Sequence, residues 1–343
     1  MVTNRPLVSV LTPTFNQERY IRECLESVQA QTYDNWEQII IDDGSTDATR
    51  KIIERQSHPQ CRCIWATHRG ILSLSDIYNE GLESARGDYV AILEGDDSWP
   101  PNKLARQLTV FDDSGAVLAW GNGVLMNQYG IQIGTVRPIR DLGPSSSLGN
   151  RELLPKLLLK NLVVPSSGVV IRKKALDRIG GFHQIKGVPY VDLPTWLALL
   201  LEMGKADHFV YTDEHVVNYR IHPDQASRRH QDLVFAAARV AEFCLDSLSQ
   251  DRLRTLGLDH KELCRIVALQ KAREAISRAE WKKASSLLRE SWVGALSPMR
   301  LSILKSGICS LLRVDLAHIS FDLQRRLPAT AKFNSILGDL WTR

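Results

Sequence analysis

The sequence predicts an α/β protein with a mixed, mostly parallel sheet, helices on both faces, and an all-helical C-terminal region. In the first hundred residues, short apolar runs alternate with segments of helical periodicity, which is typical of βαβ units. After about residue 231 the strand signals end and helical periodicity remains. The length of 343 residues also exceeds one ordinary domain. We therefore expect two domains, at residues 1–228 and 229–343.

Each element of the first hundred residues has its own signal. Residues 8–11 form a short apolar run that stops at Pro13, as a buried strand does. Residues 20–28 place apolar side chains at helical spacing, and three consecutive isoleucines at 39–41 favour a strand. Further strands are predicted at 61–65 and 89–93, and further helices around 52–53 and at 73–83.

The rest of the chain keeps strand signals at first and then loses them. Strands are predicted at 116–120, 163–171 and 210–219, and helices at 152–160, 174–179 and 193–202. Beyond these, helices are predicted at 232–248, 259–278, 280–293 and 299–325.

Composition excludes several classes of protein. Hydrophobic residues make up 44% and charged residues 24%, which is ordinary for a globular chain and excludes a collagen-like or wholly disordered one. Six cysteines are too few for a disulfide scaffold. No secretory signal is visible, and no apolar run reaches eighteen residues. A cytoplasmic location is therefore expected.

Charge is distributed unevenly along the chain. Residues 228–343 carry 20 Lys and Arg against 12 Asp and Glu, and the remainder of the chain is slightly acidic. A solvated helix surface is the favoured interpretation, because acidic residues are interspersed. Peripheral contact with the inner face of a membrane is the alternative, and no nucleic-acid partner is expected. That alternative depends on basic residues beside an apolar stripe: Arg300, Lys305, Arg313, Arg325 and Arg326.

Three polar segments follow predicted strands, at the sheet edge where open α/β proteins bind ligands. They comprise residues 12–16, 42–45 and 94–97. Neither G-x-G-x-x-G nor G-x-x-x-x-G-K-[ST] occurs, so the usual phosphate cradles of dinucleotide and P-loop proteins are missing.

The third segment gathers carboxylates. Glu94, Asp96 and Asp97 directly follow an apolar strand, where their mutual repulsion is costly unless something offsets it. A hard divalent cation does so, and such a cation also binds diphosphates. A solvated acidic turn is the structural alternative.

These motifs resemble the family 2 glycosyltransferases of the GT-A fold, over roughly residues 6–228. The resemblance is carried by Pro13-Thr14-Phe15-Asn16, Ile41-Asp42-Asp43-Gly44-Ser45-Thr46-Asp47, Leu93-Glu94-Gly95-Asp96-Asp97, Ser166-Ser167, Arg172, Gly180-Gly181-Phe182, Asp192 with Trp196, and Tyr219-Arg220-Ile221-His222. Several independent motifs in one order make the signal specific.

The resemblance implies an inverting enzyme that uses a nucleotide-diphosphate sugar, usually a UDP-sugar, together with Mg²⁺ or Mn²⁺. It implies that Pro13, Thr14 and Phe15 form a wall beside the nucleotide base and that Asp43 accepts a hydrogen bond from this base. It also implies that Asp96 lies near the ribose and sugar hydroxyls. Asp97 and His222 would bind the metal, and Asp192 would be the catalytic base. The acceptor would be a saccharide, lipid-carrier or protein hydroxyl, in polysaccharide or glycoconjugate synthesis of bacterial type.

Most of these roles have structural alternatives. We expect Asp42 or Asp43 to cap the helix that follows it. Asp192 could cap the next helix, and His222 could be a turn residue. Glu94 stands where many members of the family have the first Asp of D-x-D, which preserves the charge with a longer reach.

Two other function classes remain open. One is a non-catalytic nucleotide-sugar-binding protein with a helical interaction domain, which the intact Asp97 and Asp192 disfavour. The other is a sugar nucleotidyltransferase, which residues 11–19 disfavour because they hold no Gly-rich loop.

Overall fold

The computed structural model describes residues 5–56, 58–112, 115–137, 145–225, 230–292, 299, 303–304, 306–307 and 310. These residues fall into two compact units. The first lies within Met1–Asn150, Leu162–Gln184 and Tyr190–Ile221, and the second within Arg151–Asn161, Ile185–Pro189 and His222–Arg343.

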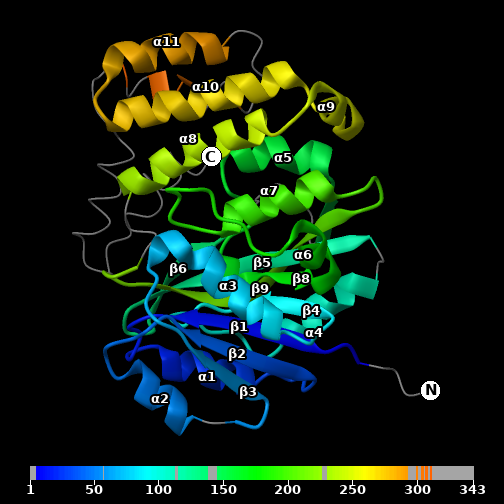
Figure 1. Cartoon of the computed structure of the whole chain (residues 1–343), viewed down its shortest axis with the longest axis vertical. Coiled ribbons are helices and arrows are strands. Elements are labelled where there is room, and N and C mark those ends of the chain that lie inside the picture. Colours follow the sequence, from blue (N-terminus) through cyan, green and yellow to red (C-terminus); the bar gives the residue numbers. More distant parts are fainter. Residues whose placement is uncertain are drawn as a thin grey trace. The chain divides into compact units, whose positions relative to one another are not determined.

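The first unit is built on one mixed sheet (Figure 1). Its described strands are β1 (Val8–Thr14), β2 (Trp36–Asp42), β3 (Cys61–Trp65), β4 (Tyr89–Ile92), β5 (Ala116–Asn127), β6 (Gln132–Val136), β7 (Ser145–Leu148), β8 (Val170–Arg172) and β9 (His208–Ile221). Their order is β3-β2-β1-β4-β8-β5-β9-β7, and β6 pairs with β5. Strands β3, β2, β1 and β4 are parallel, as are β5 and β9, whereas β8 is antiparallel to both of its neighbours. The predicted fold class is confirmed.

Helices cover both faces of this sheet, as predicted. They are α1 (Ile21–Gln29), α2 (Thr49–Arg55), α3 (Leu74–Ser84), α4 (Lys103–Leu108), α6 (Lys173–Ile179) and α7 (Asp192–Glu202). Val8 and Val10 of β1 share a buried apolar cluster with the apolar face of α1. Leu11 points to the opposite face, where Gly81 lets α3 approach the sheet closely: a Cβ at residue 81 would lie 2.8 Å from Cδ1 of Ile41.

The predicted strand at 163–171 is wrong over most of its length. Only β8 (Val170–Arg172) forms, and a 3₁₀ turn, η3 (Ser166–Gly168), precedes it. The reason is that a side chain outside the sheet satisfies the backbone of this segment. Nε1 of Trp99 donates a hydrogen bond of 2.6 Å to the carbonyl oxygen of Ser167. Apolar, β-branched composition at 163–171 therefore reflects burial rather than a ladder of strand hydrogen bonds.

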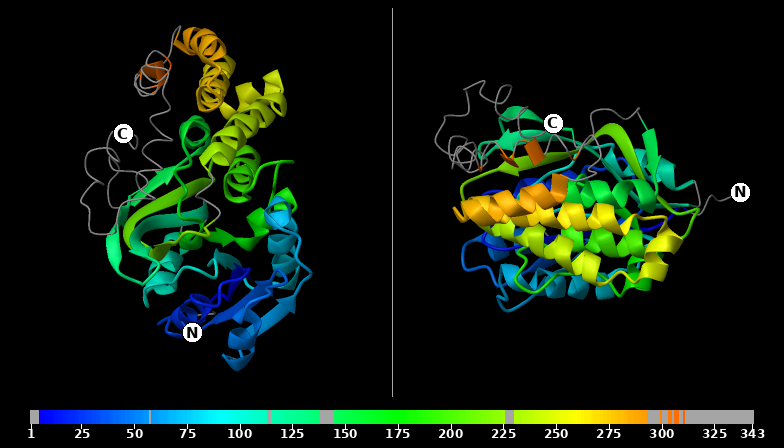
Figure 2. Two further views of the ribbon diagram at one scale, coloured as in Figure 1. Left: turned by 90° about the vertical axis from the view of Figure 1, so that its left-hand side faces the viewer. Right: turned by 90° about the horizontal axis from the view of Figure 1, so that it is seen from above.

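The second unit is helical. Its described helices are α5 (Asn150–Leu159, apart from Asn150), α8 (His230–Asp246), α9 (Gln250–Leu256), α10 (His260–Ser277) and α11 (Trp281–Trp292). Helix α10 packs against both α8 and α11 (Figure 2). The predicted helices at 232–248, 259–278 and 280–293 are confirmed, and α9 was not predicted. Most of the predicted helix at 299–325 lies outside the described residues.

Helix α5 comes from the middle of the chain but belongs to this second unit. Nε2 of Gln270 in α10 donates a 2.5 Å hydrogen bond to the carbonyl oxygen of Leu158, near the end of α5. A nearby 3.2 Å hydrogen bond joins Arg273 to the carbonyl oxygen of Leu159. The domain boundary between residues 228 and 229 stays a prediction.

Within the described part of the chain, no helix has both the length and the apolar character that crossing a bilayer requires. The five basic residues that suggest membrane contact lie outside the described residues.

Candidate active site

The three polar segments singled out in the sequence meet at one edge of the sheet. Strands β1, β2 and β4 are parallel neighbours, so their carboxyl ends lie side by side. Hydrogen bonds join the loops that follow them. The amide of Asp43 donates to the carbonyl oxygen of Thr14 (2.9 Å), and the amide of Gly95 donates to that of Pro13 (3.1 Å). The structure therefore brings the three segments together.

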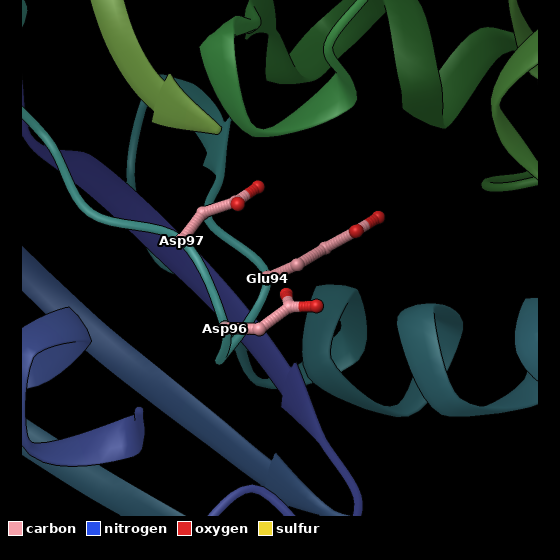
Figure 3. Close-up of side chains that lie close together, drawn as sticks. All are labelled: Glu94, Asp96 and Asp97. Carbon is pink, nitrogen blue, oxygen red and sulfur yellow. The ribbon is translucent and has the colours of Figure 1, made fainter. Parts of the chain in front are cut away.

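The acidic turn, residues 94–97, is the centre of this edge. Glu94, Asp96 and Asp97 project their carboxylates to the same side of the turn (Figure 3). One oxygen from each lies within 4.8 Å of the others. Asp96 is 6% exposed and Asp97 is 1% exposed, so the alternative of a solvated acidic turn does not describe this segment.

Hydrogen-bond donors from two other elements hold Glu94. Its Oε1 accepts hydrogen bonds from the Tyr78 hydroxyl (3.1 Å) and from Oγ of Ser166 (3.0 Å). Its amide donates to Oγ of Ser167 at 3.1 Å. Burial, followed by the charge of Asp96, raises the pKa of Glu94 to about 7. Helix α3 and η3 therefore fix a carboxylate whose charge is costly in this place.

Asp97 is more deeply buried than Asp96, and only one of its two carboxylate oxygens accepts a hydrogen bond from a described residue. Its Oδ1 accepts a 2.8 Å hydrogen bond from the amide of Arg220. Its Oδ2 is buried and accepts none from any described residue. Burial and the negative charges of Asp96 and Glu94 raise the pKa of Asp97 well above its ordinary value.

These observations fit a hard divalent cation. The side chains gathered here offer carboxylate oxygens, which Mg²⁺ and Mn²⁺ prefer, and Oδ2 of Asp97 is a buried acceptor to which no described residue donates. The same cation would offset the repulsion that raises the pKa of Glu94 and Asp97.

A second part of the edge surrounds Asp43 and Phe15. The Phe15 ring stacks on the ring of His68, with centroids 3.9 Å apart and planes 15° apart. Oδ1 of Asp43 accepts a hydrogen bond from the amide of Arg69 (2.9 Å), and Oδ2 accepts one from the amide of Gly70 (3.2 Å). Asp43 therefore orients the loop that places His68 over Phe15.

The expectation that Asp42 or Asp43 caps the following helix is wrong. The residue that precedes α2 is Ala48, and no side chain caps the helix from that position. Oδ1 of Asp42 instead accepts a hydrogen bond from the amide of Ser45 (3.3 Å), which closes a turn before the helix. The amide of Thr49 is satisfied by Asp47, at 2.9 Å.

Asp192 is the first residue of α7. The N-cap position is Val191, so the capping alternative for Asp192 does not hold. The charge of Asp192 raises the pKa of both Glu94 and the Tyr78 hydroxyl, although burial is the larger cause for each. Asp192 therefore lies within electrostatic reach of the acidic turn.

His222 directly follows β9, and its side chain is 6% exposed. It belongs to the second unit. Its role as a metal ligand stays a prediction.

Sequence reasoning missed three residues that shape this edge. Tyr78 lies at helical spacing among apolar residues and was indistinguishable from a packing residue. Its neighbour Asn79 accepts a hydrogen bond from the amide of Phe182 (2.7 Å) and donates one to its carbonyl oxygen (3.0 Å). Arg220 is part of a recognised motif, but nothing in the motif indicates that it contacts the acidic turn.

Comparisons with known proteins agree with this geometry. The sequence model of Glycosyl transferase family 2 matches residues 9–180, half of the chain. TuaG of Bacillus subtilis strain 168, a glycosyltransferase whose name refers to teichuronic acid biosynthesis, is 31% identical over 201 residues. Those residues cover 58% of this chain and 74% of TuaG.

Two solved structures share the fold. S. aureus TarS 1-349 in complex with UDP-GlcNAc has 14% sequence identity and a TM-score of 0.60, with 92% of each chain covered. The mannosyltransferase PcManGT from Pyrobaculum calidifontis, in complex with GDP-Man and Mn²⁺, has 18% identity and a TM-score of 0.52, with 90% of this chain and 88% of that chain covered. Since the family match spans half of the sequence and TuaG is covered over most of its length, this chain belongs to glycosyl transferase family 2.

Proposed function

We propose that the protein transfers a sugar from a UDP-sugar to a hydroxyl group of its acceptor, with inversion at the anomeric carbon. Family membership supplies the general activity of glycosyl transfer. The observation that carries the finer proposal is the buried acidic turn with Asp192 in electrostatic reach of it. This arrangement provides carboxylates for a cation and a separate carboxylate for a proton.

Asp192 is the base in this proposal. The acceptor oxygen forms a bond to the anomeric carbon as the bond from that carbon to the diphosphate oxygen breaks, and the acceptor proton passes to the Asp192 carboxylate. A nucleoside diphosphate leaves. A well-placed general base accelerates such a step by ~10²–10⁴-fold. No covalent intermediate with the protein is required.

Asp97, with His222, would hold Mg²⁺ or Mn²⁺. When bound, such a cation stabilises the charge that develops on the leaving diphosphate. Asp96 would accept hydrogen bonds from the ribose and sugar hydroxyls. Glu94 keeps the turn acidic, and its contacts with Tyr78 and Ser166 hold it against the other two carboxylates.

The loop after β1 would bind the nucleotide base, with Pro13, Thr14 and Phe15 as its wall. Oδ1 of Asp43 accepts one described hydrogen bond, and a carboxylate oxygen can accept two, which leaves capacity for a uracil N–H. The UDP-GlcNAc bound to TarS supports uracil as the base, whereas the GDP-Man bound to PcManGT shows that guanine is the alternative base to test.

In a thermal-shift panel with Mn²⁺, UDP-sugars should raise the melting temperature more than GDP-sugars. The opposite ranking would contradict the UDP assignment.

The decisive experiment follows the products. Wild-type protein with a UDP-sugar, Mn²⁺ and an acceptor panel should release UDP and should stop doing so in excess chelator. Asp192→Asn should keep donor affinity and lose ~10²–10⁴-fold in turnover, because an amide cannot take the proton. Unchanged turnover would remove Asp192 from this role. Release of pyrophosphate would favour a nucleotidyltransferase, and donor binding without turnover would favour a binding protein.

The acceptor is proposed to be a hydroxyl of a growing cell-surface polysaccharide or of its carrier. The name of TuaG supports this class, because teichuronic acid is such a polymer. Saccharide, lipid-linked and protein acceptors are separable in the same assay. Flotation of the full chain with anionic vesicles tests for peripheral membrane contact.

A further inference from the structure

Arg220 lies next to the end of β9 and is 2% exposed. Its backbone amide donates the 2.8 Å hydrogen bond to Oδ1 of Asp97, and its Nε donates a 2.9 Å hydrogen bond to the carbonyl oxygen of Asp96. One residue therefore holds both aspartates of the acidic turn, one through its main chain and the other through its side chain.

The remaining guanidinium nitrogens anchor Arg220 to two other elements. One donates to Oε2 of Glu23 in α1 at 2.5 Å, and another donates to the carbonyl oxygen of Asn127, the last residue of β5, at 3.4 Å. The guanidinium also lies over the Tyr20 ring, 4.9 Å from its centroid. A planar group with five N–H donors in a fixed fork can satisfy these directions at once, and a lysine ammonium cannot.

The contact with Asp97 determines which of its oxygens remains available. The amide of Arg220 donates to Oδ1 and so orients the carboxylate, while Oδ2 is buried and accepts no hydrogen bond from the residues that the structure describes. The guanidinium adds a fixed positive charge beside a turn that carries three carboxylates. Such a charge reduces their repulsion before any cation arrives.

We propose that Arg220 is the positioning residue of the acidic turn: it presents Oδ2 of Asp97 to a divalent cation and keeps the turn in its metal-binding shape. This inference rests on the proposed metal-dependent function. A purely structural ion pair with Glu23 is the competing explanation, and it predicts no effect on metal affinity in a variant that still folds.

The test is the affinity for Mn²⁺ in the absence of donor, measured on the full-length protein by calorimetry or by the electron paramagnetic resonance of free Mn²⁺. Arg220→Met keeps the backbone amide but loses every guanidinium contact, and it should weaken Mn²⁺ binding by ~10–100-fold, as outer-shell substitutions do. Arg220→Lys keeps the positive charge but lacks the planar guanidinium, so its Mn²⁺ affinity should lie between those of the wild type and of Arg220→Met. Glu23→Gln removes the ionic partner alone and should stay nearer to wild type than Arg220→Met.

Arg106→Met is the matched control, since Arg106 is half exposed and forms an ion pair with Glu214 on the surface. It should leave Mn²⁺ affinity unchanged. If Arg220→Met fails to fold, as judged by circular dichroism, Arg220→Lys supplies the comparison. Wild-type affinity in a folded Arg220 variant would overturn the proposal. A wild-type chain that binds Mn²⁺ neither alone nor together with UDP would instead contradict the metal-dependent function itself, and the role of Arg220 with it.

Discussion

Gly95 separates Glu94 from Asp96, and it packs against the loop that follows β1. A Cβ at this position would lie 2.7 Å from Oγ1 of Thr14, and closer still to Oε1 of Gln17. Thr14 is buried, so it has little room to move. A glycine is required here because of the close approach of two loops, not because of an unusual backbone conformation.

Gly95→Ala should therefore displace the acidic turn. We expect weaker Mn²⁺ binding and a loss of up to ~10²-fold in turnover, the cost that a displacement of about 1 Å can have at an active site. Gly149→Ala is the control, since a Cβ at residue 149 meets nothing within 4 Å. Isothermal titration with Mn²⁺ and initial rates would measure both effects, and equal behaviour of the two variants would contradict this account.

Glu37, in β2, is a second residue whose carboxylate is held by several donors. Its Oε1 accepts hydrogen bonds from Oγ of Ser9 (2.8 Å) and from the amide of Arg86 (2.7 Å), and Oε2 contacts the guanidinium groups of Arg86 and Arg62. Burial raises the pKa of Glu37, but these hydrogen bonds and charges outweigh it and leave the pKa below its ordinary value.

A lowered pKa stabilises the folded protein at neutral pH, and the contribution disappears as the pH falls through the folded-state pKa. Glu37→Gln should therefore cost about 1–3 kcal/mol of unfolding free energy at neutral pH. The difference from wild type should shrink as the pH falls through the lowered pKa of Glu37 in the folded protein, where the wild-type carboxylate becomes protonated. Urea denaturation across this range measures it. Asp34→Asn is the control, because Asp34 forms an exposed pair with Arg5 and should change stability by at most ~1 kcal/mol.

At the scale of single residues, the sequence predicts candidate residues but not their partners. Asp97 stands out because a carboxylate close after a buried strand is costly, whereas Asp192 stands out only through the family resemblance, since an Asp at the start of a helix is commonly a cap. Tyr78 and Arg220 do not stand out, because an aromatic on an apolar helix face and a basic residue in a strand are common. Their roles depend on contacts 16 and 123 residues away in the chain, which no local pattern encodes.

Among the secondary-structure elements, α3 connects the acidic turn with the segment that leads to α7. Tyr78 binds Glu94, and the adjacent Asn79 binds both backbone groups of Phe182. Gly181 has a φ of +100°, and a Cβ there would meet the amide of Asn79, with Cγ at 3.1 Å. The close approach at Gly181 is thus made to the Asn79 side chain.

We call the two hydrogen bonds between Asn79 and the backbone of Phe182 the Asn79 clamp. Gly181→Ala should break this clamp, because the positive φ and the close contact with Asn79 both disfavour a side chain at residue 181. We expect the distance between Asp192 and the acidic turn to change, and turnover to fall more than donor affinity. Gly180→Ala is the matched control: its φ is +79° but nothing lies within 4 Å of a Cβ, so it should cost only the ~1–2 kcal/mol of a left-handed alanine. Steady-state kinetics and melting temperatures separate the two. Similar kinetic losses in both variants would argue against the clamp.

The helices and strands were predicted well where the hydrophobic periodicity is strong. They were predicted poorly where side chains, rather than a neighbouring strand, form hydrogen bonds with the backbone. Strands β1 to β4 and helices α3, α6 and α7 follow their patterns. The segment before β8 does not, because Trp99 satisfies its backbone. Helix α9 was missed because its seven residues include only two apolar side chains, Leu253 and Leu256.

At the scale of the whole molecule, each of the two compact units is made of three separate segments, so no single boundary in the sequence divides them. Helix α5 contributes buried leucines at 153, 154, 157 and 158, and its end is bonded to Gln270 of α10. A chain that ends at residue 228 would keep α5 and lose α10. Such a chain would lose the hydrogen bonds from Gln270 and Arg273 to the end of α5, and each leucine that this loss exposes would cost about 1.5–3 kcal/mol.

A fragment of residues 1–228 should therefore melt at a lower temperature than the full chain, bind a hydrophobic dye, and aggregate. A fragment of residues 1–310 keeps every described helix and is the control, which should keep the oligomeric state and the melting temperature of the full chain. Size-exclusion chromatography and dye fluorescence distinguish them. A monomeric 1–228 fragment with the melting temperature of the full chain would show that the predicted boundary marks an independent domain.

The bond between Asp97 and Arg220 spans 123 residues. During synthesis the acidic turn leaves the ribosome long before β9 does, and N-terminal parts of a chain begin to fold first. The carboxylates of the acidic turn are thus synthesised well before Arg220, whose amide holds Asp97. If Arg220 has the proposed positioning role, a nascent chain lacks the residue that orients Asp97 until translation has passed residue 220, and a product that ends earlier should bind a divalent cation more weakly than the full chain.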